Sequence, residues 1–450
     1  MKFLLALAGA VAAVAAIRRF LRIAGVGAAY KAKAACSALF VSGLDLDPNR
    51  ADEVSADAYR IMRLFSASVD RETKTVAASF LGLKERRAVW RPGLGAALAF
   101  RPLPPAPALP APRRNDPALP WPGGEAPVPA EPPAVGRVLD AAFSEPEPKR
   151  LRRTRAIVVV REGRLVAERY APGFSAATPL NGWSMSKSVL GALIGTLVGE
   201  GKLATSDKNL LAEWRAPRDG RAGIALEDLL RMRGGLAFSE RYSDPLSDVN
   251  RMLFDGPDAG GFAASRPLAH APGTHWQYAS GMTNILSLIA RRALGEEEYP
   301  LWPRRALFDP LGMSSAVFEQ DGCGTFVGSS FLFATARDWA RFGLLHALDG
   351  SWNGRRLLPE GWVKLVTTPT PQSPNGRYGA HWWLKLSKEL GGETAAARRL
   401  PADAFHALGH EGQCLTVIPS LSLVIVRLGL SIDITAWDHA AFLDDLIKAL

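Results

Sequence analysis

One stretch constrains the fold of this 450-residue chain more than any other, a long apolar run that opens on a serine and a lysine. Residues 189–198 are almost entirely apolar or small, which predicts a buried helix that begins near Ser184. Residues three apart share one helix face, so Ser184 Oγ and the Lys187 amine are expected within hydrogen-bond reach. The helix N-terminus adds positive potential beside the serine. An activated serine nucleophile requires this geometry.

The pattern Ser-x-x-Lys is short, and chance produces it in ordinary sequences. The alternative interpretation is a helix-capping serine followed by a solvated lysine. The position of Lys187 favours catalysis, because a lysine at the mouth of an apolar helix is costly to bury. Its desolvation would lower its pKa toward that of a usable base.

The composition, with 48% hydrophobic and 22% charged residues, indicates one large globular domain with appendages. The net charge is +10, but the basic residues are scattered and no nucleic-acid motif occurs, so no nucleic-acid partner is expected. Cys36, Cys323 and Cys414 are too far apart for a C-x-x-C pattern, and the seven histidines show no H-E-x-x-H spacing. Neither a metal nor a cofactor is expected.

The N-terminus is apolar over residues 3–17 and is then interrupted by Arg18, Arg19 and Arg22. We expect a signal peptide or membrane anchor over residues 1–30. The run is short for a span of about 20 residues, which favours an interrupted, tilted or interfacial helix. The arginines favour a cytoplasmic location for the downstream part of the chain, so the orientation stays open.

The remainder divides into three parts: an N-terminal extension (31–101), a Pro-rich linker or strap (102–134) and a main domain (135–450). In the extension we expect short strands, for example at 38–43 and 75–80, and a helix near 51–64.

The main domain has strand patterns near both of its ends and a helical middle. This order predicts an α+β fold in which terminal helices flank an antiparallel sheet and an all-helical lobe is inserted. The expected strands are 156–160, 165–170, 414–418 and 423–427, and the expected terminal helices are 138–143 and 437–450.

Two further stretches place polar side chains on rigid turns. Tyr278 and Ser280 lie on a loop between a Pro-Gly turn and an apolar helix, where we expect them to be exposed. The alternative for Tyr278 is a ring packed in the core. Gly409 and Gly412 flank polar residues at a strand edge, where a ligand can approach the backbone. The Gln413 N–H would then join the Ser184 N–H in an oxyanion hole, and the alternative is a plain Gly-rich turn.

Together these stretches resemble, in chain order, the serine β-lactamase and penicillin-binding-protein superfamily, class C-like branch. Ser184-Met185-Ser186-Lys187 resembles its S-x-x-K element, Tyr278-Ala279-Ser280 its Y-x-N or Y-x-S element, and His410-Glu411-Gly412 lies where the family has K-T-G. The resemblance covers about 135–450 and is greatest to esterases and aminohexanoate-oligomer hydrolases. It implies a β-lactamase/transpeptidase-like fold that follows an N-terminal membrane segment. It also implies a location at the inner membrane, facing the periplasm. The arginines after residue 17 favour the cytoplasmic face, which therefore remains an alternative.

The resemblance implies a mechanism in which Ser184 attacks an ester or amide carbonyl of a small molecule. Lys187 and Tyr278 serve as general base and acid, and Ser280, His410 and Gly412 contact the substrate. Histidine in place of the family's lysine removes a permanent cation, so neutral esters or amides are expected over anionic β-lactams. The alternatives are a penicillin-binding-type peptidase, a β-lactamase, or a silent sensor that acylates without turnover.

Overall fold

The fold is organised by a five-stranded antiparallel sheet that joins two distant parts of the chain. In this computed structural model, which describes residues 2–55, 57–127 and 130–450, the strand order is β12-β13-β14-β5-β6. The predicted pairing of early with late strands is confirmed, whereas β12 was not predicted. The strands are β5 (Thr154–Arg161), β6 (Arg164–Tyr170), β12 (Phe405–Gly409), β13 (Gln413–Ile418) and β14 (Leu423–Gly429).

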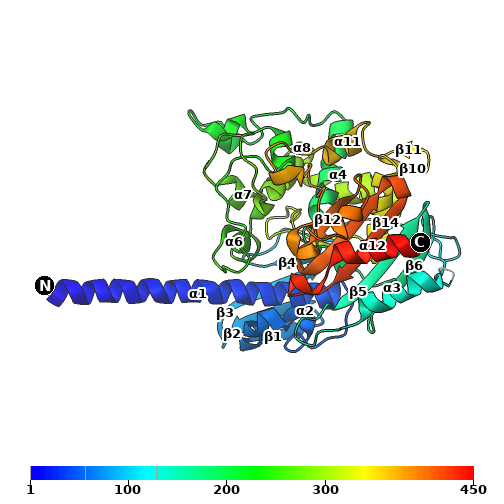
Figure 1. Cartoon of the computed structure of the whole chain (residues 1–450). Coiled ribbons are helices and arrows are strands. Elements are labelled where there is room, and N and C mark those ends of the chain that lie inside the picture. The colour runs from blue at the N-terminus through cyan, green and yellow to red at the C-terminus, as the bar shows by residue number, and fades with distance from the viewer. Residues whose placement is uncertain (1, 56, 128–129) are drawn as a thin grey trace.

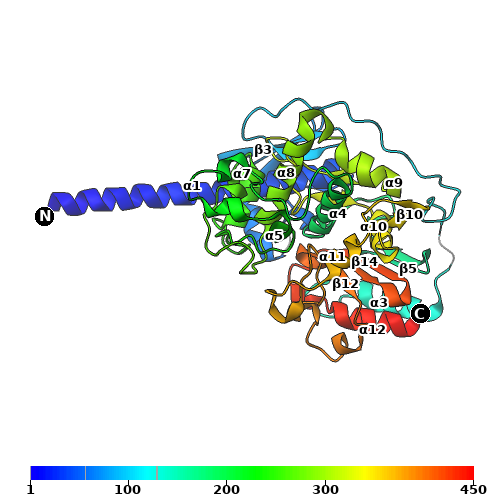
Figure 2. The ribbon, with the colours of Figure 1, turned by 90° about the horizontal axis from the view of Figure 1, so that it is seen from above.

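Both faces of this sheet are covered by helices (Figures 1 and 2). Alternate side chains of β5 point to opposite faces. Val159 packs with α3 (Pro133–Phe143) and α12 (His439–Ala449), and Val158 packs in the core that includes α10 (Ala336–Ala347). The two terminal helices therefore flank the sheet as predicted.

The inserted lobe is mostly helical, and its central helix is α4 (Met185–Gly199). Residues 185–197 of α4 are all buried, which confirms the predicted buried helix. Short strands β7 (Leu180–Asn181), β8 (Val317–Phe318) and β9 (Leu332–Ala334) form a small sheet next to it. The other helices of the lobe are α5 (Leu226–Leu230), α6 (Asp248–Phe254), α7 (Ala259–Ala264), α8 (Ser280–Glu298), α9 (Asp309–Leu311) and α11 (Trp362–Thr367).

The N-terminal extension is a helix packed on a second antiparallel sheet. The helix α1 (Lys2–Phe40) is continuous, and its outer half projects from the body (Figures 1 and 2). The expected strand at 38–43 is wrong, because small apolar residues at helical spacing bury the inner half of α1 through Leu39. The sheet contains β1 (Phe65–Asp70), β2 (Thr75–Phe80), β3 (Leu83–Arg91) and β4 (Gly95–Leu98), and is preceded by α2 (Asp52–Ser55) and the 3-10 segment η1 (Asp57–Leu64).

A buried ion pair joins the inner half of α1 to the main domain. Lys33 pairs with Glu319, which is fully buried. Glu319 Oε1 also accepts hydrogen bonds from Ser37 Oγ at 2.9 Å and from the Ala96 backbone N–H at 2.7 Å. Because a buried carboxylate needs such partners, this part of α1 belongs to the core of the protein.

The structure does not support the expected N-terminal membrane segment. Apolar side chains of the outer half of α1 are exposed, among them Leu4, Val11 and Ile17. In the described ranges, however, no helix is both long enough and apolar enough to cross a membrane. The basic residues that come after position 17 interrupt the apolar run.

The Pro-rich segment runs as an extended strap over the main domain. Its Trp121 is buried beneath the Arg341 guanidinium, whose carbon lies 5.7 Å from the ring centre. Arg341 also donates to the Pro122 and Gly124 carbonyls at 3.0 and 2.8 Å. An arginine of α10 therefore fastens the strap.

Candidate active site

Ser184 and Lys187 are in direct contact at the start of α4. Lys187 Nζ donates to Ser184 Oγ at 2.8 Å and to the Ser329 carbonyl at 3.0 Å, and the lysine is only 1% exposed. The alternative of a solvated lysine is therefore wrong. Trp183, just before the serine, has a φ of +47°, a conformation that is uncommon outside glycine and is associated with functional sites.

Burial lowers the pKa of Lys187 to about 8, although the charge of Glu240 acts in the opposite direction. Removing the ammonium from water disfavours its charged form. A substantial fraction of Lys187 is consequently neutral at mildly alkaline pH, with its lone pair available for the Ser184 proton.

Tyr278 lines the same cleft as the serine. Lys187 Nζ lies 4.9 Å from its ring centre. Burial, and secondarily the charge of Glu240, raises the pKa of Tyr278, which keeps the phenol protonated. The ring is half-buried against Trp383, with centroids 5.3 Å apart.

Glu240 is a buried carboxylate that was not predicted from the sequence. It accepts from the Ser280 backbone N–H at 2.9 Å and from Ser280 Oγ. Burial raises the pKa of Glu240, and the charge of Lys187 opposes that rise. The available signal was a lone acidic residue after the apolar run 236–238. The expectation that Ser280 is exposed for substrate is wrong, because it is fully buried and bonded to Glu240.

A cleft of about 330 Å³ opens over Ser184, and Tyr278, Gly409 and His410 line it. Gly409 allows the end of β12 to approach the loop before the serine, because a Cβ on it would lie 2.2 Å from the Gly182 carbonyl oxygen. The loop before the serine and the end of β12 are thereby held together.

Gly412 and Gln413 are not among the residues that line this cleft. The Gly412 carbonyl accepts from Arg427 Nη1 at 2.8 Å. The Gln413 side chain bonds both backbone groups of Gly429. The expectation that Gly412 contacts substrate is therefore not supported, and the Gln413 N–H as second oxyanion donor stays a prediction. The Ser184 N–H has no acceptor within the described part of the chain.

His410 forms the wall of the cleft that faces the N-terminal extension. Its Nε2 is 2.7 Å from the Tyr59 hydroxyl, and its ring stacks on Tyr242 with centroids 5.2 Å apart. Burial lowers the pKa of His410 to about 4, so the imidazole is neutral at neutral pH. Neither tyrosine carries a sequence signal, because these contacts form only in the folded chain.

The cleft offers no fixed cation to a substrate. Among the described residues, no lysine or arginine lines it, since Lys187 lies buried beneath Ser184. The one carboxylate in the described lining, Glu411, accepts from Trp183 Nε1 at 3.0 Å, and burial raises its pKa to about 7. This lining is suited to an uncharged substrate.

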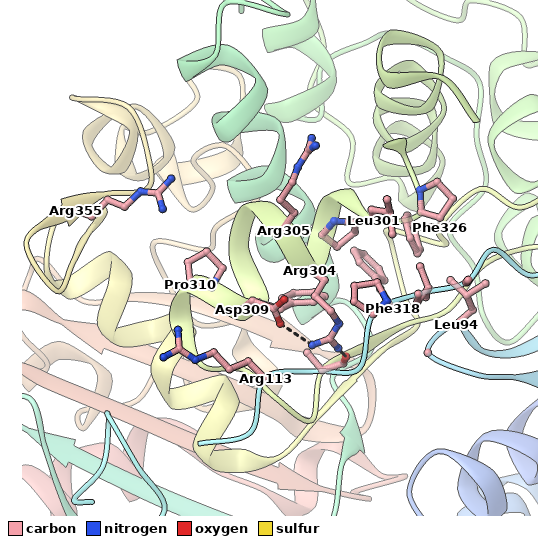
Figure 3. A pocket seen from close by; sticks show the side chains of 18 residues that line it. Leu94, Arg113, Leu301, Arg304, Arg305, Asp309, Pro310, Phe318, Phe326 and Arg355 are labelled. Carbon is pink, nitrogen blue, oxygen red and sulfur yellow. Dashed lines mark hydrogen bonds and ion pairs between the residues drawn. The ribbon is translucent and has the colours of Figure 1, made fainter. Parts of the chain in front are cut away.

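A separate cavity of about 620 Å³ lies under the Pro-rich strap (Figure 3). It shares no described lining residue with the Ser184 cleft. Its arginines Arg113, Arg305 and Arg355 do not converge, and Arg304 is paired with Asp309 at 2.9 Å. Across residues 2–55, 57–127 and 130–450, no cluster of histidine, cysteine and acidic residues could hold a metal ion.

Comparisons with known proteins identify the family of the main domain. The Beta-lactamase family model matches residues 139–429. A 6-aminohexanoate-dimer hydrolase of Paenarthrobacter ureafaciens is 28% identical over 302 residues, covering 61% of this chain and 72% of that protein.

Two solved structures share the fold. A family VIII carboxylesterase has a TM-score of 0.54 at 15% identity, covering 72% of this chain and 99% of its own. A penicillin-binding-protein homologue from Caulobacter crescentus has a TM-score of 0.51 at 19% identity, covering 70% of this chain and 99% of its own.

The family match and the fold define the class of protein, the superfamily of serine β-lactamases and penicillin-binding proteins. The chain belongs to the Beta-lactamase family. The proteins it resembles include a 6-aminohexanoate-dimer hydrolase and, in fold, a family VIII carboxylesterase. The N-terminal extension and the whole of the Pro-rich strap lie before the matched region.

Proposed function

We propose that this protein is a serine hydrolase that cleaves uncharged esters or amides through an acyl-enzyme on Ser184. The observation that carries the proposal is the 2.8 Å contact between Ser184 Oγ and the Nζ of a buried Lys187. A neutral amine at this distance is placed to accept the hydroxyl proton as the serine attacks a carbonyl.

The other groups supply the rest of the cycle. The Ser184 N–H, at the start of α4, stabilises the oxyanion, together with the Gln413 N–H as the second proposed donor. Tyr278 passes a proton to the leaving group. A water activated by Lys187 or Tyr278 then frees the acid, and the two residues titrate as a unit.

The nature of the cleft supports neutral substrates. The neutral His410 and the absence of lysine or arginine from the described lining leave a substrate carboxylate without a charged partner. A charge-assisted hydrogen bond contributes about 1.5–3 kcal/mol, so its loss should disfavour anionic β-lactams.

The test is Ser184→Ala assayed on p-nitrophenyl acetate, a linear amide and a chromogenic cephalosporin. We expect turnover of the ester or amide to fall by about 10³-fold or more. Ser188→Ala is the matched control, because Ser188 is in the same helix and its hydroxyl donates to the His381 carbonyl. Retention of most activity by Ser184→Ala would overturn the proposal.

A protein that acylates without turnover is the second candidate, since slow deacylation leaves the same residues in place. Pre-steady-state kinetics separate the two. A stoichiometric burst of p-nitrophenol followed by no further release would favour the silent sensor, whereas sustained release supports the hydrolase.

A further inference from the structure

An apolar cavity of about 600 Å³ lies between the N-terminal extension and the main domain. The extension contributes Ile23 and Val26 of α1 and Met62 of η1, and the main domain contributes Trp183 and Phe254. None of the described lining residues carries a charge, because the only titratable side chains there are tyrosines and the neutral His410. Its volume lies within the range of about 300–1,000 Å³ that small-molecule sites occupy.

This cavity adjoins the catalytic cleft across a shared wall. Tyr242 and His410 line both spaces, and Trp183, which lines the cavity, directly precedes Ser184. The hydrogen bond from Tyr59 to His410 ties that wall to the extension. A substrate chain that extends from Ser184 into the cavity would therefore have to pass the His410 ring.

The wall contributed by the extension is held rigidly. Gly27 has no room for a side chain, because a Cβ there would lie 2.4 Å from the Phe65 ring. The Tyr30 ring packs edge-on against Phe254 at 5.5 Å, and Arg22 of α1 pairs with Asp255 at the end of α6. Lys31 Nζ also donates to the Phe65 carbonyl at 2.6 Å. The cavity is thus a preformed feature of the fold.

We infer that this cavity binds the hydrocarbon chain of the substrate's acyl group, so that the enzyme prefers esters or amides of medium- and long-chain carboxylic acids. The inference rests on the proposed hydrolase function. The acyl group is the part assigned, because Tyr278, the proposed proton donor to the leaving group, lines the cleft but not the cavity. A hydrocarbon chain gains free energy when it leaves water for an uncharged apolar lining. A polar group buried there would instead lack a hydrogen-bond partner.

The first test is a chain-length series on the wild-type protein with p-nitrophenyl acetate, butyrate, hexanoate and octanoate below their aggregation limits. Burial of one methylene corresponds to at most about a fourfold gain, so kcat/KM should rise by about twofold to fourfold for each methylene beyond butyrate. A flat or falling series beyond butyrate would contradict the inference. A preference for octyl acetate over ethyl octanoate would contradict the assignment to the acyl side.

The second test fills the cavity from the extension. Ile23→Trp and Ile61→Trp should each lower kcat/KM for the octanoate by about tenfold or more and leave the acetate within about twofold. Ile17→Trp is the matched control, because Ile17 lies on the same helix, is 58% exposed and does not line the cavity. Ile61 is 61% exposed, so its replacement remains informative if Ile23→Trp does not fold.

The outcomes separate this inference from the proposed function. An equal loss on both esters, or no loss on either, would overturn the acyl-chain site while leaving the hydrolase intact. Ester hydrolysis that persists in Ser184→Ala would instead overturn the hydrolase proposal itself.

Discussion

The two walls of the cleft differ in how the chain builds them. The serine wall consists of Ser184 and Tyr278, with Lys187 buried behind the serine on the same helical turn. The histidine wall consists of Tyr242 and His410, and Tyr59, 351 positions away from His410 in the sequence, supports it from behind by a hydrogen bond. The first wall lies within the family match, whereas the second depends on the extension before it. Proton transfer and substrate selection should therefore respond to different mutations.

The largest effect is expected at the serine wall. Lys187→Met removes the proposed base and should lower kcat for p-nitrophenyl acetate by about 10³-fold or more, since groups acting as a unit lose most of their catalysis together. Lys208→Met, at an exposed position, is the control and should keep the wild-type rate. If Lys187→Met kept more than a tenth of the wild-type activity, Lys187 would not be the general base.

Replacing the histidine should alter selectivity rather than the basic chemistry. His410→Lys restores a cation and should raise the kcat/KM ratio of a chromogenic cephalosporin to p-nitrophenyl acetate by about tenfold or more. His410→Gln is the neutral control and should leave the ratio near its wild-type value. Efficient cephalosporin hydrolysis by the wild type, unchanged in His410→Lys, would mean that position 410 does not determine the preference.

A smaller effect is expected from the extension's hydrogen bond to that wall. Tyr59→Phe removes one hydrogen bond of about 1 kcal/mol and should reduce kcat/KM for p-nitrophenyl octanoate by about fivefold. The acetate is the internal control, because it is too short to depend on the cavity. Equal losses on both esters would indicate that Tyr59 supports the fold as a whole.

The subtlest effect concerns the pH profile. Because the pKa of Lys187 is about 8, wild-type kcat/KM should rise with pH to a plateau above that value, where the amine is neutral. Glu240 favours the ammonium, so Glu240→Gln should lower the pKa of Lys187 and move the rise to lower pH, with the plateau within about threefold. A midpoint that stays in place or moves to higher pH would contradict this coupling.

The serine wall was predictable from the sequence because its geometry is local. Three-residue spacing places Ser184 beside Lys187 in any helix that begins there. The structure also confirms that the early and late strands of the main domain form one sheet, which short apolar runs bounded by turn residues indicated. Local patterns indicated much of the fold and the reactive centre.

The errors concern contacts that no local pattern encodes. Ser280 looked exposed on its loop, but Glu240 holds it from a distance of 40 positions. The apolar start of the chain suggested a membrane segment. It is instead the outer half of helix α1, whose inner half is buried against a sheet. The role of Tyr59 emerged only from the folded chain.

Identification of the acylated residue would decide whether Ser184 is the nucleophile. The protein is mixed with p-nitrophenyl butyrate, quenched in acid during the burst and studied by mass spectrometry of the intact chain and its peptides. We expect a single butyryl group on Ser184, absent from Ser184→Ala and present in Ser188→Ala. A butyryl group on another residue, or turnover that continues in Ser184→Ala, would contradict the proposed mechanism.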